Sequence, residues 1–181
     1  MSFDFPHAKP RKLGYDPVAV NQFIERARAE FTADHNGDVL TIADQEFPLV
    51  KGGYSVTAVD VALDRLEDAF VARKYKQQLG DAGSEALMAR ANEIKVLLIG
   101  RLERPRRQRF DHTSYILRGY SRKQVDKFLD NVARHIDTRS ELKVDEVRRI
   151  LFTPKRGGYA ENQVDAFIAR VIELLQIEKV L

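Results

Sequence analysis

The sequence predicts an all-α protein built from two related halves, and three observations support this class. The dipeptide Gly-Tyr occurs four times, at 14–15, 53–54, 119–120 and 158–159. After each occurrence, apolar residues recur at three- and four-residue steps, which is the period of an amphipathic helix. The spacing from Gly14 to Gly53 is the same as that from Gly119 to Gly158, so one pair of motifs is repeated at a constant offset of 105.

This repeat divides the chain into three parts. Residues 1–79 hold the first pair of units, with motifs at 14 and 53, and residues 106–181 hold the second pair, with motifs at 119 and 158. Residues 80–105 form a helical spacer. Each unit is expected to be a helix-loop-helix whose apolar stripe cannot be buried alone. We therefore expect the units of each pair to associate, giving two pseudo-symmetric pairs joined by the spacer.

Three of the four motifs carry a residue that can cap a helix. Asp16, Ser55 and Ser121 follow their tyrosines at the position where a side-chain oxygen can accept hydrogen bonds from the first helical turn. Ser121 and Gln124 have the spacing of a capping box. Ala160 stands at this position in the fourth motif and has no such oxygen, so that helix should begin less stably by about 1 kcal/mol.

The glycine, the tyrosine and a following valine also have predicted structural roles. The tyrosine falls just before the cap and the valine four residues inside the helix, which is the spacing of a hydrophobic staple. The glycine is predicted to supply a tight reversal of the chain. The twelve residues are Gly14, Tyr15, Val20, Gly53, Tyr54, Val59, Gly119, Tyr120, Val125, Gly158, Tyr159 and Val164.

The remaining elements follow from chain-breaking residues. The stretch from Gly80 to Gly83 is predicted to interrupt the chain, and Ser84 to cap a fifth long helix that runs to Leu102. Two further short helices are predicted, near 42–46 and near 144–150. Each leads into a phenylalanine that shortly precedes a glycine of the repeat.

Composition favours an intracellular globular protein. The chain has 181 residues, a formal net charge of +3, 44% apolar residues and no cysteine. The absence of cysteine excludes disulfides, cysteine nucleophiles and thiolate metal sites. No apolar run approaches the ~20 residues of a membrane span, and the N-terminus lacks the pattern of a signal peptide, so a cytoplasmic location is expected.

Enzyme motifs are absent from the sequence. It contains no glycine-rich phosphate loop, no His-Glu-x-x-His and no Gly-x-Ser-x-Gly. The four histidines lack the spacing of metal ligands, although His7 and His112 are equivalent in the repeat. Asp60, Asp126 and Asp165 occupy one position of the repeat, where pairing with a neighbouring Arg or Lys explains them better than catalysis. We therefore expect a non-enzymatic protein with no catalytic residue, metal or cofactor.

Positive charge is concentrated in the second half. Residues 106–181 carry 16 basic and 11 acidic side chains, which is a net charge of +5. Five arginines lie close together along the chain: Arg101, Arg104, Arg106, Arg107 and Arg109. Such a cluster can meet an anionic lipid surface or nucleic acid. A solvated linker is the favoured interpretation, because no aromatic residue lies between the arginines.

The four motifs resemble the N-terminal domain of the bacterial DivIVA family. Its signature is a phenylalanine, a loop, Arg-Gly-Tyr-Asp/Ser, two or three polar residues and Val-Asp/Asn-x-Phe-Leu. Residues 117–129, Leu-Arg-Gly-Tyr-Ser-Arg-Lys-Gln-Val-Asp-Lys-Phe-Leu, are the closest match, followed by residues 155–168. The resemblance covers both halves but not the spacer. It implies a short helix and a loop leading into a parallel two-helix coiled coil, with two copies of the domain forming a pair.

The resemblance also implies where a membrane would be contacted. In the family, an apolar and a basic residue at the loop tip before Gly-Tyr insert into the surface and bind anionic head groups. Leu117 and Arg118 match this pattern. The other tips depart from it in order, spacing or apolar content, and their residues are Lys12, Leu13, Val50, Lys51, Lys155 and Arg156. A second interpretation stays open for Leu13, Val50 and Leu117, which is that they close the core under the tyrosine.

The leading hypothesis is a non-enzymatic DivIVA-like scaffold or adaptor of bacterial cell division or polar growth, held peripherally on the inner face of the membrane by its loop tips. Its expected partners are an anionic lipid surface, other proteins of that machinery and, where stripe residues stay exposed, a second copy in a homodimer. A soluble adaptor that has lost membrane binding is the alternative. A nucleic-acid binder that uses the arginines from Arg101 to Arg109 ranks third.

Overall fold

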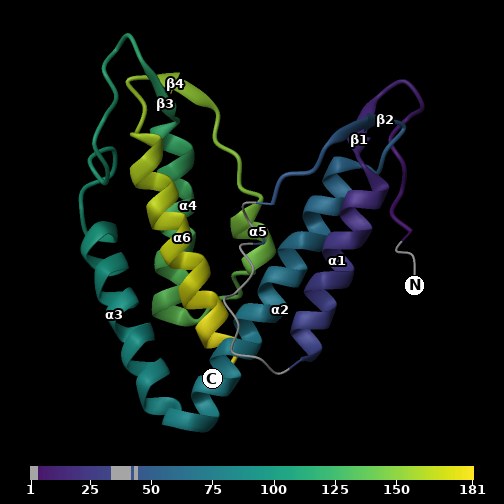
Figure 1. Cartoon of the computed structure of the whole chain (residues 1–181). Coiled ribbons are helices and arrows are strands. Elements are labelled where there is room, and N and C mark those ends of the chain that lie inside the picture. Colours follow the sequence, from purple (N-terminus) through teal and green to yellow (C-terminus); the bar gives the residue numbers. More distant parts are fainter. Residues whose placement is uncertain (1–3, 34–41, 43–44) are drawn as a thin grey trace. The chain divides into compact units, whose positions relative to one another are not determined.

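The computed structural model describes residues 4–33, 42 and 45–181. In order along the chain, the described part contains β1, α1, β2, α2, α3, β3, α4, α5, β4 and α6 (Figure 1). The chain separates into two compact parts, Met1–Lys74 and Tyr75–Leu181. From here on, unit 1 and unit 2 mean these two parts and not the single repeats. Helix α2, Val56–Ala82, begins in unit 1 and ends in unit 2.

The prediction of an all-α fold is wrong, because each unit also contains a small antiparallel sheet and the fold is mixed α/β. In unit 1, β1 (Leu13–Tyr15) pairs with β2 (Leu49–Lys51), and in unit 2, β3 (Arg118–Tyr120) pairs with β4 (Pro154–Arg156). Such short strands cannot show alternating hydrophobicity. Their backbone groups are satisfied by a segment that is distant in the sequence, which local patterns do not reveal.

The sheets place two helices side by side in each unit. In unit 1, α1 (Pro17–Thr32) follows β1 and α2 follows β2, so both begin at the sheet and run in the same direction (Figure 1). Their apolar faces share one core, which also takes up residues of the chain between them. The buried apolar residues of this core are Val20, Phe23, Ile24, Ala27, Ile42, Phe47, Tyr54, Val59 and Leu63.

Unit 2 repeats this arrangement and adds helices. Helix α4 (Arg122–Thr138) follows β3, and α6 (Glu161–Glu178) follows β4, again in parallel (Figure 1). Helix α3 (Ser84–Leu102) runs antiparallel to them and contributes Leu87, Ala91, Ile94 and Leu98 to their core. The short helix predicted near 144–150 is α5 (Val144–Arg148). The short helix predicted near 42–46 falls partly outside the described residues.

The caps differ from the predictions in the second half of the chain. Asp16 caps α1 as predicted, and its Oδ1 accepts from the Val18 amide at 3.0 Å. Ser121 makes no capping bond, and Gln124 turns instead to the connection before β4, where its Oε1 accepts from the Thr153 amide at 2.7 Å. The predicted capping box is therefore wrong.

The break between α2 and α3 is also shorter than predicted. Helix α2 continues through Gly80, and the chain turns at Gly83, which has φ of 71°. Glycine tolerates this left-handed conformation. Ser84 is consequently the first residue of α3 and does not cap it.

The glycines of the four motifs do not make reversals, so that prediction is wrong as well. A Cβ added to Gly14, Gly53 or Gly119 would lie within 3.0 Å of the carbonyl oxygen of the facing tyrosine, and one on Gly158 would collide with the backbone of Gly119. Two backbones cross here, and Tyr15 and Tyr54 exchange backbone hydrogen bonds of 3.0 and 2.8 Å. The glycines are required because this crossing leaves no room for a side chain. The turns lie one residue earlier in the second motif of each pair, at Gly52 and Gly157, where φ is positive.

Candidate functional site

At each crossing, the hydroxyl groups of the two tyrosines contact polar side chains of the neighbouring helices. In unit 1 the Tyr15 hydroxyl lies near the Asp60 carboxylate, and the Tyr54 hydroxyl accepts from Asn21 Nδ2 at 3.3 Å. The tyrosine of one motif thus reaches the helix of the other motif, in both directions. Burial and the Asp60 carboxylate raise the pKa of Tyr15.

Unit 2 has the same reciprocal pairs with two carboxylates. The Tyr120 hydroxyl lies near the Asp165 carboxylate, and the buried Tyr159 hydroxyl donates to Asp126 Oδ1 at 2.9 Å. Burial raises the pKa of Tyr159 to about 12, and the Asp126 carboxylate adds to this rise. The prediction that Asp60, Asp126 and Asp165 pair with Arg or Lys side chains is wrong, because Asp126 accepts from the Tyr159 hydroxyl and the other two lie near the hydroxyls of Tyr15 and Tyr120. These contacts join the tyrosines at the end of each sheet to the helices that follow it.

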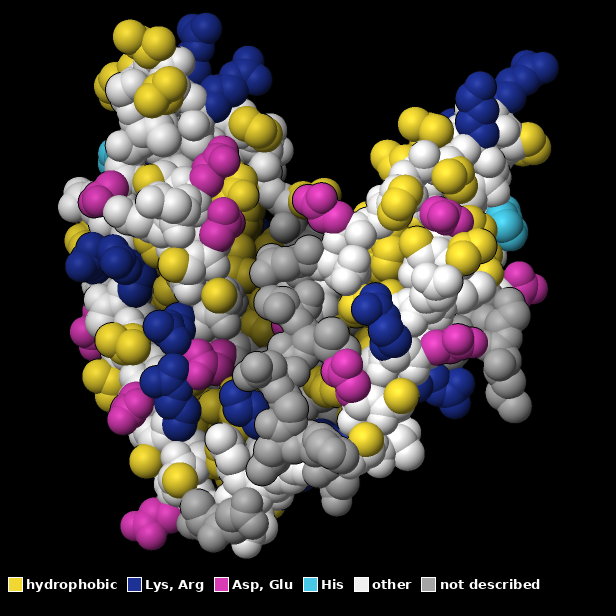
Figure 2. Space-filling view, in the orientation of Figure 1, with side chains coloured by type: hydrophobic (Ala, Val, Ile, Leu, Met, Phe, Trp, Pro, Cys, Tyr) yellow, Lys and Arg dark blue, Asp and Glu magenta, His cyan; other side chains and the backbone are white. Residues whose placement is uncertain are grey.

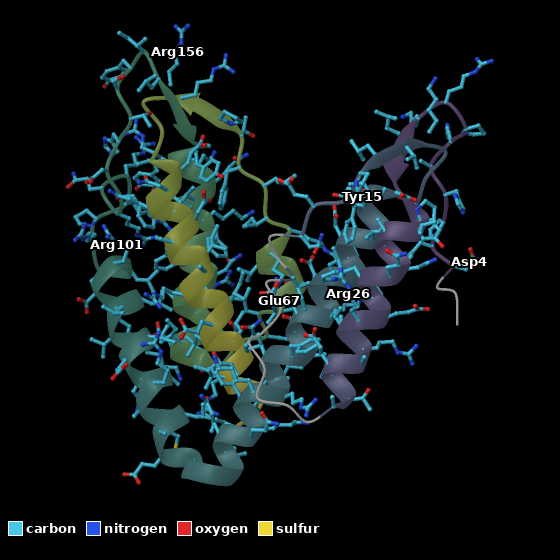
Figure 3. The ribbon with its side chains drawn as sticks, in the orientation of Figure 1. Asp4, Tyr15, Arg26, Glu67, Arg101 and Arg156 are labelled. Atoms are coloured by element: carbon cyan, nitrogen blue, oxygen red, sulfur yellow. The ribbon has the colours of Figure 1, made fainter. Side chains whose placement is uncertain are left out.

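The arginine cluster is built into the fold of unit 2. Arg109 is 8% exposed, and its Nη1 donates to Asp130 Oδ1 at 3.0 Å and to the Asp126 carbonyl at 3.2 Å. The Arg107 amide donates to Asp126 Oδ2 at 2.9 Å. Arg101 lies at the end of α3 (Figure 3) and covers the ring of Phe110 at 5.1 Å. A solvated linker is therefore the wrong interpretation for Arg109. Because its guanidinium is buried and bonded within unit 2, it is not available to bind the phosphates of a lipid or nucleic acid.

His7 and His112, which are equivalent in the repeat, contact tyrosines of the two crossings. His7 Nδ1 lies 2.7 Å from the Gly52 carbonyl oxygen, and its ring contacts Tyr54. His112 Nε2 lies 2.6 Å from the Arg107 carbonyl oxygen, and its ring contacts Tyr159. Among the described residues, no cluster of three or more His, Asp or Glu side chains could hold a metal ion.

The sheets and their loops end in exposed apolar side chains. At the tip of unit 2, Tyr115, Ile116 and Leu117 are 85%, 87% and 61% exposed. Arg118 of β3 and the exposed Lys155 and Arg156 of β4 lie on the same two-stranded sheet, in which Arg118 pairs with Arg156. Arg156 lies at the outer end of this sheet (Figure 3). We call residues 115–118 with 155–156 tip 2.

Unit 1 has a smaller version of the same surface. Leu13, Leu49 and Val50 are 55%, 54% and 36% exposed, beside the exposed Lys12 and Lys51. We call residues 12–13 with 49–51 tip 1. At the end of each unit that carries its sheet, hydrophobic and basic side chains lie together (Figure 2). The interpretation that Leu13, Val50 and Leu117 close the core is wrong, because all three side chains face solvent.

Backbone hydrogen bonds hold tip 2 in shape. The Leu117 amide donates to the Ser114 carbonyl at 3.0 Å, and the Gly157 amide donates to the Leu117 carbonyl at 3.3 Å. The Thr113 hydroxyl also donates to the Leu117 carbonyl, at 3.3 Å. The exposed apolar side chains thus lie on a turn whose backbone is held in place by hydrogen bonds.

Sequence reasoning missed part of both tips. Tyr115 and Ile116 were not among the predicted contact residues, although they directly precede Leu117 in an apolar run, and that run was the available signal. Leu49 was missed in the same way beside Val50. The structure also brings Lys155 and Arg156 next to Arg118, although the two segments lie far apart in the sequence.

No family model, curated protein or solved structure matches the chain. Over the residues that the structure describes, no helix combines the length and the apolar character needed to cross a bilayer.

Proposed function

We propose that this protein is a non-enzymatic DivIVA-like scaffold of bacterial cell division or polar growth that binds the inner membrane surface peripherally through its tips. One observation carries the proposal: tip 2 combines three highly exposed apolar side chains with three basic ones at the end of a single two-stranded sheet. The parallel helix pair that follows each sheet is also what the resemblance to the DivIVA family implies.

The chemistry of tip 2 suits the boundary between head groups and acyl chains. Burying an exposed Ile or Leu side chain there is worth about 1.5–3 kcal/mol, and each basic residue near an anionic leaflet adds about 1 kcal/mol. Tyr115 fits the same region, because aromatic rings with a polar end favour membrane interfaces. The bonded turn lowers the entropy lost when these side chains are fixed in the membrane.

Tip 1 should contribute less. Its apolar side chains are less exposed than Tyr115 and Ile116, and it has two basic residues, Lys12 and Lys51, where tip 2 has three. We therefore expect tip 2 to determine most of the affinity for vesicles. Proteins of the division or polar-growth machinery would then bind elsewhere on the membrane-bound scaffold.

Vesicle flotation tests this proposal. The parent protein should float with phosphatidylglycerol-containing vesicles and much less with phosphatidylcholine vesicles. Ile116→Glu combined with Leu117→Glu should lower the affinity at least tenfold, because two inserted side chains are lost and two negative charges are added.

Leu151→Glu is the matched control. Leu151 is 90% exposed in the same unit but lies before β4 and outside tip 2, so this variant should float like the parent protein. Circular dichroism verifies that the helices of each variant are intact. If the parent protein fails to float, or the tip variant floats as well as the parent, the membrane proposal is wrong and the soluble adaptor takes its place.

A further inference from the structure

A cavity lies at the end of unit 2 that is away from its sheet. The C-terminal ends of α4 and α6 meet the first half of α3 there (Figure 1). The cavity has a volume of about 520 Å³, which is within the range of small-molecule sites. All three helices contribute to its polar lining, which comprises Asn92, Lys95, His135, Glu178 and, directly after α4, Arg139.

The acidic group of this cavity, Glu178, already has two partners. Its Oε1 accepts from Lys95 Nζ at 2.7 Å, and its Oε2 lies 2.8 Å from His135 Nε2. Burial raises the pKa of Glu178, but the bonds from Lys95 and His135 outweigh burial and hold this pKa below its usual value. The carboxylate is therefore ionised and paired within the protein, so it does not make the cavity a site for a cation.

The remaining polar groups of the cavity suit an anion. Within the described part of the chain, the Arg139 guanidinium has no hydrogen-bond or ion-pair partner, and the same holds for the Asn92 side chain. Lys95 uses one of its three ammonium protons on Glu178. The two cations outnumber the one carboxylate, so the cavity has a net positive charge, and protonation of His135 would increase it.

Apolar side chains line the same cavity. Met88 and Ala91 lie on α3, one turn before Asn92 and Lys95, and Leu181 follows α6. Met88 is 50% exposed, and its unbranched thioether side chain can adapt to ligands of different shapes. The cavity therefore offers apolar contacts next to positively charged groups.

We propose that this cavity binds a small organic carboxylate with an apolar body. The planar guanidinium of Arg139 can donate to both oxygens of a carboxylate, Lys95 and Asn92 supply further donors, and the apolar body lies against Met88. A carboxylate with a single negative charge matches the excess of one cation. A phosphate dianion would instead bring surplus negative charge close to Glu178.

Octanoate is the probe that tests this proposal. In the NMR spectrum of the whole chain, the amide signals of Asn92, Lys95 and Arg139 should shift at millimolar octanoate. Acetate, which lacks the apolar body, and octylammonium, which has the opposite charge, should each bind at least tenfold more weakly. Absence of these shifts with octanoate, or equal binding of octylammonium, would overturn the proposal. Inorganic phosphate that binds more tightly than octanoate would contradict the assignment of a carboxylate.

Arg139→Gln tests the anchoring group. This variant should bind octanoate at least tenfold more weakly, because it loses the charged partner of the carboxylate. Lys123→Gln is the matched control, since Lys123 is also exposed and lies in the first turn of α4, at the other end of the helix. It should bind octanoate like the parent protein, and circular dichroism verifies both folds. Unchanged binding by Arg139→Gln would refute the site.

The cavity and the tips lie on different residues, so the two proposals fail separately. The tip variant Ile116→Glu with Leu117→Glu should lose flotation but bind octanoate as the parent protein does. Arg139→Gln should still float with anionic vesicles. Loss of octanoate binding in the tip variant would place the probe on tip 2 and overturn the cavity proposal.

Discussion

Units 1 and 2 share a backbone crossing but differ in the polar groups beneath it. In the alignment of the two halves, Asp126 of unit 2 corresponds to Asn21 of unit 1, and Arg109 corresponds to Asp4. The buried Tyr159 hydroxyl therefore donates to a carboxylate, whereas the Tyr54 hydroxyl accepts a longer bond from an amide. Glycine and tyrosine are common to both crossings, whereas the polar partner in the second helical turn is a carboxylate in unit 2 and an amide in unit 1.

The units also differ in what covers their helix pairs. In unit 2, α3 packs on α4 and α6 and extends their core along both helices. Among the described residues of unit 1, no third long helix covers α1 and α2. Unit 2 also carries the larger exposed apolar tip. We therefore expect unit 2 to be the more stable unit and the one with the stronger surface contact.

The largest expected loss of stability comes from substitutions at the backbone crossing, which both units share. Gly14→Ala and Gly119→Ala should each destabilise their own unit by about 3 kcal/mol or more, at the upper end of overpacking effects, because the new Cβ collides with a backbone oxygen that cannot move aside. Urea unfolding, with hydrogen exchange to assign the loss to a unit, measures this effect. A loss seen for only one of the two variants would refute a shared geometry.

Gly80→Ala is the control for this comparison. A Cβ on Gly80 meets nothing within 4 Å, and the residue lies inside α2. Replacing a glycine in a helix by alanine should stabilise the protein by about 0.5–1 kcal/mol. The same substitution is therefore expected to have opposite signs at the crossing and in the helix.

An intermediate effect tests where the units differ. Tyr159→Phe should cost about 1–3 kcal/mol, because it leaves a buried carboxylate oxygen of Asp126 without its donor. Tyr54→Phe removes a neutral bond to Asn21 and should cost about 0.5–1.5 kcal/mol. Unfolding of both variants under the same conditions gives the difference. Equal losses would mean that the charge on Asp126 adds nothing to the closure.

The smallest effect concerns the helix starts. Asp16→Ala should cost about 1 kcal/mol, since its side chain caps α1. Ser121→Ala should cost less than half of that, because Ser121 makes no capping bond. Exchange of the first amides of α1 and α4 reports each change directly. A larger loss at Ser121 would show that its hydroxyl stabilises the start of α4.

The helices were the predictable part of the fold. Apolar residues at three- and four-residue steps locate α1, α2, α4 and α6, and Asp16 caps α1 as its position predicts. The strands were not predictable, because such short segments show no period and their partners are distant in sequence. The role of the motif glycines was missed for a related reason: the atom that excludes a Cβ belongs to another motif.

The candidate site was predicted in outline only. The apolar and basic residues before Gly-Tyr were identified from the motif, but the exposure of Leu117 and the neighbourhood of Arg118 and Arg156 follow from strand pairing. The burial of Arg109 could not be foreseen, because two of its acceptors, Asp130 and the Asp126 carbonyl, lie on the separate helix α4.

Helix α2 has a consequence for how the two units fold. It runs from Val56 to Ala82 and passes the boundary at Lys74 and Tyr75 without interruption. Its last two turns, which include Tyr75 and Leu79, pack against the core of unit 2, and a segment that short is not a stable helix alone in water. Melting of unit 1 would fray these turns, and their detachment would fray unit 1 in return. A duplicated chain of this design therefore gains cooperativity between its halves from a continuous segment of backbone, and not from a loop that could lengthen freely.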